Sequence, residues 1–178
     1  MFTVATEPGL LVRYTSWTTS PSWLAYDPAR GTLADTKLVP PSPADFSSVT
    51  SVEVNAKSAD GTMVPLSIVY PKGISKNGSN PTWLTGYGAY GYVIAPSFGP
   101  TFLAWYERGG VYAVCHVRGG GEYGEGWHLA GKIATKQHTI DDFIACAQYL
   151  IEQGYTSPAR LAGEGTSAGA ITIGGAIT

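Results

Sequence analysis

The first part of the chain contains short runs rich in apolar, aromatic and threonine residues. They predict strands over Leu10–Thr19, Ser22–Tyr26 and Thr32–Val39, with strong turn residues at 27–31 between the last two. Strands of this length cannot bury both of their faces alone, so we expect them to belong to a larger sheet, such as one propeller blade. The proline-rich run Pro40–Pro43 then predicts a linker.

A hairpin is predicted after this linker. Every second residue is apolar within Val49–Lys57, Asp60 and Gly61 have the residue types of a tight turn, and Met63–Tyr70 returns as the partner strand. The polar stretch that follows, up to Pro81, is predicted to be a loop.

From Thr82 onward the pattern predicts strands that alternate with helices. A short strand at Trp83 and Leu84 runs into a loop, Thr101–Arg108 favours a helix, and Val111–Val117 is an almost continuous apolar run. Such a run is typical of a strand that is covered on both faces of the sheet. The order of these elements indicates an α/β domain.

The clearest predicted helix is Ile140–Gln153, in which the apolar residues fall on one stripe. Thr139 is the expected N-cap and Gly154 the expected C-cap. Asp141 and Asp142 then fall in the first turn, where the helix dipole favours negative charge. We therefore expect a structural role for both carboxylates rather than a catalytic one.

Composition narrows the function classes. A net charge of -2 with 13% charged residues argues against a nucleic-acid-binding protein, and no apolar run is long enough to span a membrane. We expect a soluble protein of the cytoplasm or periplasm, and the sequence does not choose between them. The two cysteines, Cys115 and Cys146, make no disulfide framework and are predicted to be buried free thiols.

Residues Gly165–Gly169 fit the pattern Gly-x-Ser-x-Gly, with a predicted strand before them and an apolar, helix-like run after them. In a nucleophile elbow the serine occupies a sharp, strained turn, where side chains at the flanking glycines would collide with neighbouring backbone. The pattern predicts Ser167 as a nucleophile and the N–H of Ala168 as a donor to an oxyanion. The alternative interpretation is a glycine-rich turn in an ordinary α/β domain.

No base for this serine is evident in the sequence. All three histidines, His116, His128 and His138, precede Ser167, whereas the α/β-hydrolase order places the acid and then the histidine after the serine. Only eleven residues follow Ser167, and none is acidic or histidine. The histidines show no metal-site spacing, and the loop Gly119–Gly124 lacks the lysine of a phosphate-binding loop. We expect no metal and no cofactor.

A series of short motifs in one order is more specific than the elbow alone. These segments are Asp60–Pro65, Gly86–Tyr90, Arg118–Gly124 continuing to Trp127 and His128, Lys136 and Gln137, Asp141–Phe143, Tyr149 and Leu150, Gly154–Pro158, and Arg160 with Leu161. Through them the chain resembles the prolyl oligopeptidase family of serine peptidases. That resemblance implies a β-propeller that caps an α/β-hydrolase domain and an activity that cleaves short peptides after proline.

The resemblance also implies a domain division and site residues. Residues 1–45 would be the last propeller strands and a linker, and residues 46–178 the N-terminal half of the hydrolase domain, cut off after the elbow. By its motif position Tyr87 would donate its hydroxyl to the oxyanion beside the Ala168 N–H, and Tyr90 would line the proline pocket. The catalytic aspartate and histidine would lie beyond Thr178.

The elbow departs from the best-known family members, which have Gly-Gly-Ser-Asn-Gly-Gly where this chain has Gly165–Ala170. This departure leaves an esterase or acyl-peptide hydrolase of the same fold as an alternative. A second alternative is a non-catalytic truncated product. Without the missing half of the domain, we expect the isolated chain to be inactive and, because a sheet edge and an apolar face are exposed, poorly soluble.

Overall fold

The structure is a computed structural model that describes residues 9–178, so the start of the predicted propeller segment lies outside the described residues. The chain divides into two compact units. The first comprises the described residues up to Ser48 together with Pro96–Leu103, and the second comprises Val49–Ala95 and Ala104–Thr178.

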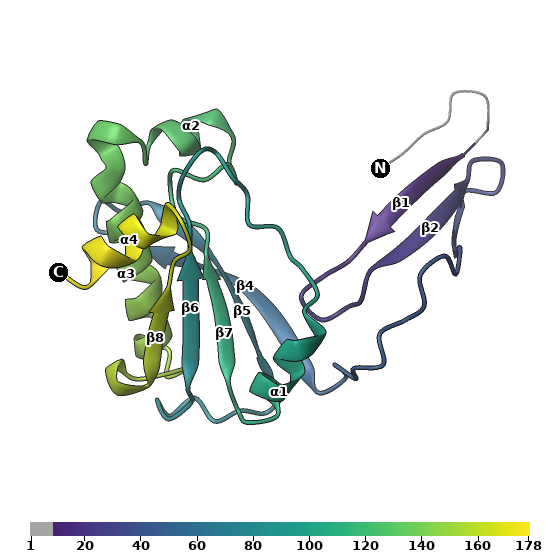
Figure 1. Cartoon of the computed structure of the whole chain (residues 1–178), viewed down its shortest axis with the longest axis horizontal. Coiled ribbons are helices and arrows are strands. Elements are labelled where there is room, and N and C mark those ends of the chain that lie inside the picture. The colour runs from purple at the N-terminus through teal and green to yellow at the C-terminus, as the bar shows by residue number, and fades with distance from the viewer. Residues whose placement is uncertain (1–8) are drawn as a thin grey trace. The chain divides into compact units, whose positions relative to one another are not determined.

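The first unit contains a three-stranded antiparallel sheet in the order β1-β2-β3 (Figure 1). Its strands are β1 (Leu10–Tyr14), β2 (Ser22–Asp27) and β3 (Thr32–Asp35). The turn between β2 and β3 forms as predicted, because Asp27 Oδ1 accepts the Ala29 N–H at 2.9 Å. The three predicted strands are therefore confirmed, although the first and the third end earlier than the sequence suggested.

The second unit contains a mixed five-stranded sheet in the order β4-β5-β7-β6-β8. Its strands are β4 (Val49–Lys57), β5 (Met63–Pro71), β6 (Thr82–Gly86), β7 (Val111–Cys115) and β8 (Leu161–Glu164). The β4–β5 hairpin is antiparallel, β5 pairs antiparallel with β7, and β7, β6 and β8 run parallel. Because parallel neighbours end at the same edge of the sheet, the segments after β6 and β8 lie side by side.

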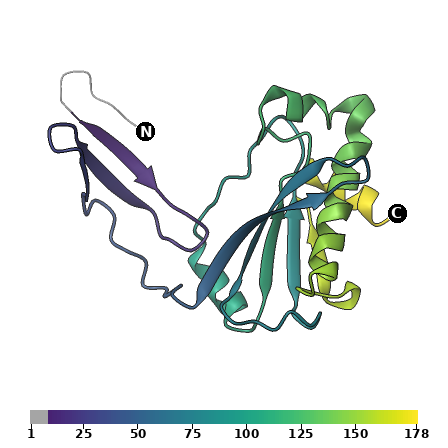
Figure 2. The same ribbon diagram turned by 180° about the vertical axis from the view of Figure 1, so that it is seen from behind.

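Four α-helices accompany the strands within residues 9–178. They are α1 (Leu103–Tyr106), α2 (Glu125–Leu129), α3 (Lys136–Glu152) and α4 (Gly169–Ala176), with 3₁₀ turns at Pro100–Phe102, Ile133–Thr135 and Pro158–Arg160. Helices α3 and α4 pack against each other on the same side of the sheet (Figures 1 and 2). Helix α2 was not predicted, and it begins directly after the glycine-rich loop Gly119–Gly124.

Helix α3 begins at Lys136, four residues before the predicted start. Thr139 is therefore not the N-cap. It is fully buried in the first turn, where its hydroxyl donates to the carbonyls of Arg118 at 2.7 Å and Gly131 at 3.1 Å. Asp141 and Asp142 consequently lie in the second turn, too far along for the dipole argument.

The predicted end of α3 is confirmed. Gly154 lies just past the helix with φ of +73°, a conformation that favours glycine. Its N–H donates to Ile151 and the Tyr155 N–H donates to Leu150, the bond pair of a Schellman motif. The chain then turns back toward β8.

The core of the second unit lies between α3 and the sheet. Its fully buried members are Ala56, Val64, Leu66, Ile68, Leu84, Val111, Ala113, Cys115, Cys146 and Leu150. The predicted apolar stripe of α3 is only partly right. Phe143 and Leu150 are buried, but Ile140 and Ile144 are half-exposed, because the innermost face of the helix also holds Asp142 and Cys146.

The prediction of two free thiols is wrong. Cys115 at the end of β7 and Cys146 in α3 form a disulfide, and both residues are completely buried. Because α3 packs against β7, the two Cα atoms lie 6.0 Å apart, a separation that a disulfide bridges readily. The disulfide joins the helix to the central strand of the sheet.

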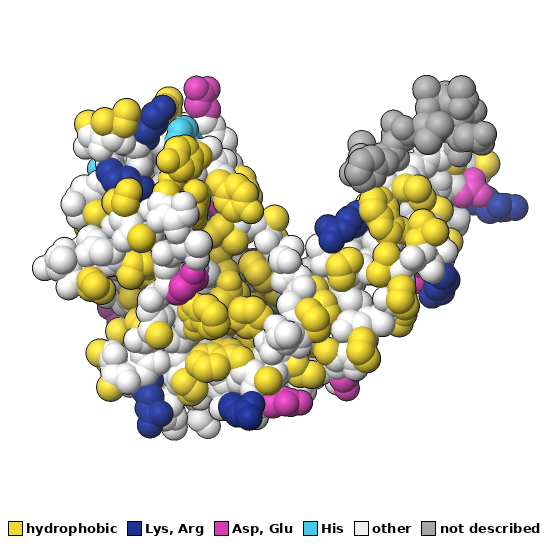
Figure 3. Space-filling view, in the orientation of Figure 1, with side chains coloured by type: hydrophobic (Ala, Val, Ile, Leu, Met, Phe, Trp, Pro, Cys, Tyr) yellow, Lys and Arg dark blue, Asp and Glu magenta, His cyan; other side chains and the backbone are white. Residues whose placement is uncertain are grey.

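The surface of the second unit has two notable features. Hydrophobic side chains gather over its strands on the face shown in Figure 3. Strand β8 pairs with β6 on one side only, so within the described residues it is an edge of the sheet. No helix in the described part of the chain combines the length and apolarity needed to cross a membrane.

Candidate active site

The turn between β8 and α4 has the geometry of a nucleophile elbow. Ser167 is exposed and has φ of +54°, a strained left-handed conformation for a serine. A Cβ on Gly165 would clash with the carbonyl of Gly169, and one on Gly169 would lie 2.8 Å from the carbonyl oxygen of Gly86. The predicted collisions at both flanking glycines are confirmed.

Glu164, which the sequence interpretation missed, holds this turn in place. Glu164, the last residue of β8, accepts the Thr166 hydroxyl at 2.6 Å through Oε1 and the Thr85 hydroxyl at 2.8 Å through Oε2. One carboxylate therefore joins β8, β6 and the elbow. The signal in the sequence that could have indicated this role is the position of Glu164 directly before the Gly-x-Ser-x-Gly motif.

The first turn of α4 leaves the Ala168 N–H available. In this turn the N–H groups of the residues after Ala168 donate to the carbonyls three residues earlier, with the pairs Gly169 to Thr166, Ala170 to Ser167 and Ile171 to Ala168. The Ala168 N–H donates to no backbone carbonyl within the described residues. This donor lies next to Ser167, where an oxyanion would form.

Tyr87 follows β6 directly and lies beside the elbow. Thr172 of α4 donates its hydroxyl to the Tyr87 carbonyl at 3.1 Å, and a Cβ on Gly169 would lie 3.5 Å from the Tyr87 Cα. The Tyr87 ring packs edge-on against Tyr92, with ring centroids 5.6 Å apart. The structure therefore brings the loop of Tyr87 together with Ser167 and Ala168.

Tyr90 lies three residues further along the same loop. Its side chain is 80% exposed, and its backbone also has a positive φ, +56°. It lines a cavity of about 550 Å³ together with Ala168. Tyr90 and the elbow thus share one hollow in the surface of the second unit.

The three histidines make structural contacts. His116 is buried, with Nε2 2.8 Å from the Ser67 hydroxyl, while Nδ1 of His128 and of His138 each donate to a backbone carbonyl at 2.8 Å. Within residues 9–178 no histidine is hydrogen-bonded to Ser167. The same residues contain no group of three or more His, Cys, Asp or Glu that could hold a metal ion.

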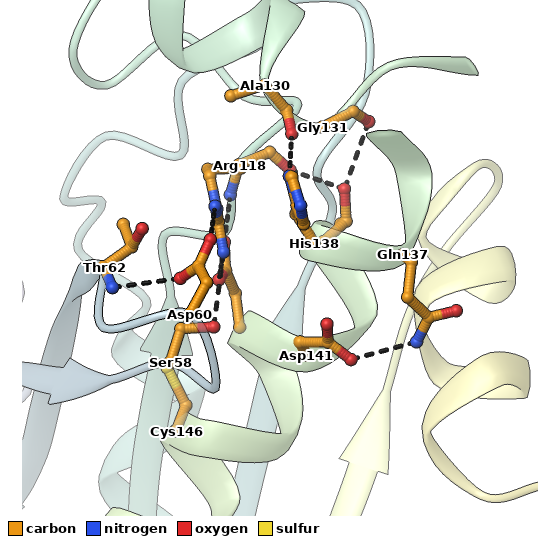
Figure 4. A network of polar contacts seen from close by, with 12 residues as sticks. Ser58, Asp60, Thr62, Arg118, Ala130, Gly131, Gln137, His138, Asp141 and Cys146 are labelled. Atoms are coloured by element: carbon orange, nitrogen blue, oxygen red, sulfur yellow. Dashed lines mark hydrogen bonds and ion pairs between the residues drawn. The ribbon is translucent and has the colours of Figure 1, made fainter. Parts of the chain in front are cut away.

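Arg118 is the buried centre of an ion network (Figure 4). Its Nε and Nη2 donate to the two carboxylate oxygens of Asp142 at 2.9 and 2.6 Å, and Nη1 pairs with Asp60. The Arg118 hydrogen bond holds the pKa of Asp60 well below its usual range. Asp142 therefore neutralises a buried cation, which accords with the structural role expected for it.

Known proteins are similar to this chain in sequence and in fold. The model of the prolyl oligopeptidase family matches residues 96–178. A prolyl endopeptidase of Elizabethkingia meningoseptica is 38% identical over 97% of this chain and 24% of its own length. A solved prolyl endopeptidase structure matches with a TM-score of 0.92 at 36% identity, over 98% of this chain and 26% of that one. By these matches the chain is similar to the prolyl oligopeptidase family.

Oligopeptidase B of Trypanosoma brucei, another solved structure, has a TM-score of 0.86 at 41% identity, over 96% of this chain and 24% of that one. The chain spans about a quarter of the length of the curated relatives it matches. As in the prolyl oligopeptidase family, its fold combines the end of a β-propeller with the first part of an α/β-hydrolase domain. The division at residues 45 and 46 stays a prediction.

Proposed function

We propose that Ser167 is the nucleophile of a serine peptidase that hydrolyses short peptides after proline. The observation that carries this proposal is the backbone of Ser167, held at φ of +54° between β8 and α4 by two glycines that have no room for a side chain. A strained turn that exposes a serine hydroxyl at the end of a parallel strand is the arrangement that acyl transfer requires.

The reaction would proceed through an acyl-enzyme. The Ser167 oxygen attacks the scissile carbonyl carbon and passes its proton to a histidine supplied by sequence outside these 178 residues. The Ala168 N–H and the Tyr87 hydroxyl donate to the oxyanion that forms. The leaving amine takes the proton from the histidine, and water then hydrolyses the ester on Ser167. No metal or cofactor takes part in this scheme.

The names of the relatives support a peptide substrate. Solved structures of prolyl oligopeptidase B from Galerina marginata hold 25- or 35-residue substrates in variants that each lack one serine, aspartate or histidine. One of these structures matches this chain with a TM-score of 0.91 at 30% identity. The proposed role of Tyr90, as part of the proline pocket, rests on its position in the family motif and on the cavity that it lines.

One observation favours a second candidate, an esterase or acyl-peptide hydrolase. Ala168 and Ala170 replace the asparagine and glycine of the best-known members, immediately after the nucleophile. A fold does not fix the substrate, so specificity has to be measured.

The test is a chimera in which residues 1–178 replace the matching segment of the Elizabethkingia meningoseptica enzyme. We expect it to cleave a peptide after proline faster than it cleaves a simple acyl ester. Ser167→Ala should lower kcat by a factor of about 10⁴ or more. Ser75→Ala, which alters an exposed serine in the loop after β5, is the matched control and should leave kcat unchanged.

Three results would count against the proposal. Equal activity of the Ser167→Ala chimera would remove Ser167 as nucleophile, and a preference for the acyl ester would support the second candidate. Rapid turnover by the 178-residue chain alone would contradict the need for an outside base.

Where this peptidase would act, in the cytoplasm or the periplasm, stays a prediction from the sequence.

A further inference from the structure

The cavity beside the elbow has a wall that the proposed reaction does not use. On one side it is lined by residues of the proposed site, and on the other by the segment that leads into α3. Six of the lining residues carry the argument: Tyr90, His128, Lys132, Lys136, Ala168 and Ile171. A volume of about 550 Å³ is in the range of pockets that bind small ligands or side chains.

The charge of this wall is positive. Lys132 and Lys136 both line the cavity, and none of its described lining residues is Asp or Glu. In Figure 3, Lys or Arg side chains and a His side chain lie close together at the upper edge of the second unit, with one acidic side chain above them. The cavity therefore offers cations to a bound group without a carboxylate in its own lining.

Lys136 is the better placed of the two lysines. Its ammonium group donates to the Gly88 carbonyl at 2.6 Å, which uses one of its three hydrogens and fixes it next to the loop of Tyr87. Burial lowers the pKa of Lys136, because the charged ammonium group loses contact with water. No carboxylate in the cavity lining compensates for this loss. An anion in the cavity would supply the missing compensation.

His128 and the apolar residues complete the site. His128 lines the cavity, and its Nδ1 donates to the Gly119 carbonyl, so the ring is held in one orientation. Tyr90 and Ile171 provide apolar surface for the methylene groups of a side chain. A carboxylate on a short apolar stem matches this combination of groups.

We propose that the side of this cavity formed by Lys132 and Lys136 is a subsite for a carboxylate of the peptide substrate, next to the proline pocket that Tyr90 lines and close to the bond that Ser167 attacks. The inference rests on the proposed function and names the substrates that the site prefers. Two sources supply the same chemistry, the side chain of Asp or Glu and the free C-terminus of a short peptide. Lys132 and Lys136 bind either one by charge-assisted hydrogen bonds.

The test uses the chimera and three peptides of equal length that share one proline. The first is neutral and amidated, the second has Glu in place of Gln beside the scissile bond, and the third is neutral with a free C-terminus. We expect kcat/KM to be about tenfold higher for at least one acidic peptide than for the neutral one, since a charged hydrogen bond is gained. High salt should reduce that ratio.

Two lysine variants separate this subsite from a general effect of charge. Lys132→Gln should reduce the acidic-to-neutral ratio severalfold, whereas Lys57→Gln, which removes an exposed lysine at the end of β4, should not change it. Equal ratios for the chimera and for Lys132→Gln would overturn the subsite and leave the proposed function intact. Failure to cleave the neutral peptide would instead count against the proposed function.

A second measurement keeps the subsite falsifiable if the chimera does not fold. The 178-residue chain is treated with a lysine-methylating reagent, with or without N-acetyl-glutamate amide, and each lysine is quantified by mass spectrometry. Modification of Lys132 and Lys136 that is slower with the probe than without it, while Lys57 reacts equally fast in both, supports the subsite. Rates at Lys132 and Lys136 that the probe does not change overturn it.

Discussion

Backbone strain is concentrated around one place in this molecule. Within residues 9–178, four residues other than glycine have a positive φ, and three of them, Tyr90, Ile133 and Ser167, lie at the elbow or line the cavity beside it. For a β-branched residue such as Ile133 this conformation is a true outlier. Strained residues persist where the surrounding structure holds them and are common at functional sites.

The role of the Tyr87 hydroxyl can be tested by removing one atom. Tyr87→Phe keeps the ring contact with Tyr92 and removes a proposed oxyanion donor. We expect kcat of the chimera to fall by about 10²–10³, with KM little changed, since the lost interaction exists only in the transition state. Tyr92→Phe is the control, and an equal loss in both variants would argue that packing is responsible.

Two glycines close together in sequence should respond in opposite ways to the same substitution. Gly165→Ala should destabilise the chain by about 1–3 kcal/mol, because the new methyl group meets the Gly169 carbonyl. Gly174→Ala should stabilise it by about 0.5–1 kcal/mol, since Gly174 is inside α4 and its new Cβ would meet no atom within 4 Å apart from its chain neighbours and the backbone of the helix itself. Denaturant unfolding measures both, and similar effects would contradict the elbow geometry.

At the scale of elements, the sequence predicted the hairpin, the strands of both units and the order strand, elbow, helix. It placed the start of α3 wrongly because the first turn of that helix is polar. Lys136, His138 and Thr139 fit there only because distant carbonyls accept their hydrogen bonds. Such contacts have no local sequence signal, and tertiary context overrides propensity.

Sequence reasoning also indicated part of the candidate site, but not the contacts that support it. The motif identified Ser167 and Ala168, and the resemblance to the family indicated Tyr87 and Tyr90. The supporting contacts of Glu164 could not be assigned, because they depend on which strand lies next to β8. The disulfide was missed for the same reason, since 31 residues separate two cysteines that only the packing of α3 brings together.

The Arg118 network makes a prediction about pH. The depressed pKa of Asp60 means that its contribution to stability is present above about pH 4 and is lost as the pH falls further, because the unfolded carboxyl titrates near about 3.9. The stability difference between the wild-type chain and Asp60→Asn should therefore shrink below about pH 4.

Denaturant midpoints between pH 7 and pH 3 measure this difference. Glu152→Gln, at the exposed end of α3, is the control and should show no such dependence on the Arg118 network. A difference between the wild-type chain and Asp60→Asn that stays constant over the whole range would contradict the proposed pairing.

At the scale of the whole molecule, the disulfide should dominate the stability of the second unit. Closing a loop of 31 residues contributes about 3–4 kcal/mol by its effect on chain entropy. A reductant should therefore lower the Tm of the wild-type chain, and should leave the Tm of the Cys115→Ala/Cys146→Ala double variant unchanged. Because both cysteines are buried, reduction should require partial unfolding and be slow. A wild-type Tm that does not respond to prolonged reduction would show that the thiols are free.

The strand order also has a consequence for synthesis on the ribosome. Strand β6 is made before β7, yet its neighbours in the sheet are β7 and β8, so it has no strand to pair with until β7 emerges. When β7 adds to β5, it provides an edge on which β6 can dock, and β8 joins last. Each later strand then adds at a free edge without displacing an earlier one. A pause in translation ahead of Val111 would leave β6, with Trp83 and Leu84, unpaired, and there we expect a nascent-chain chaperone to bind.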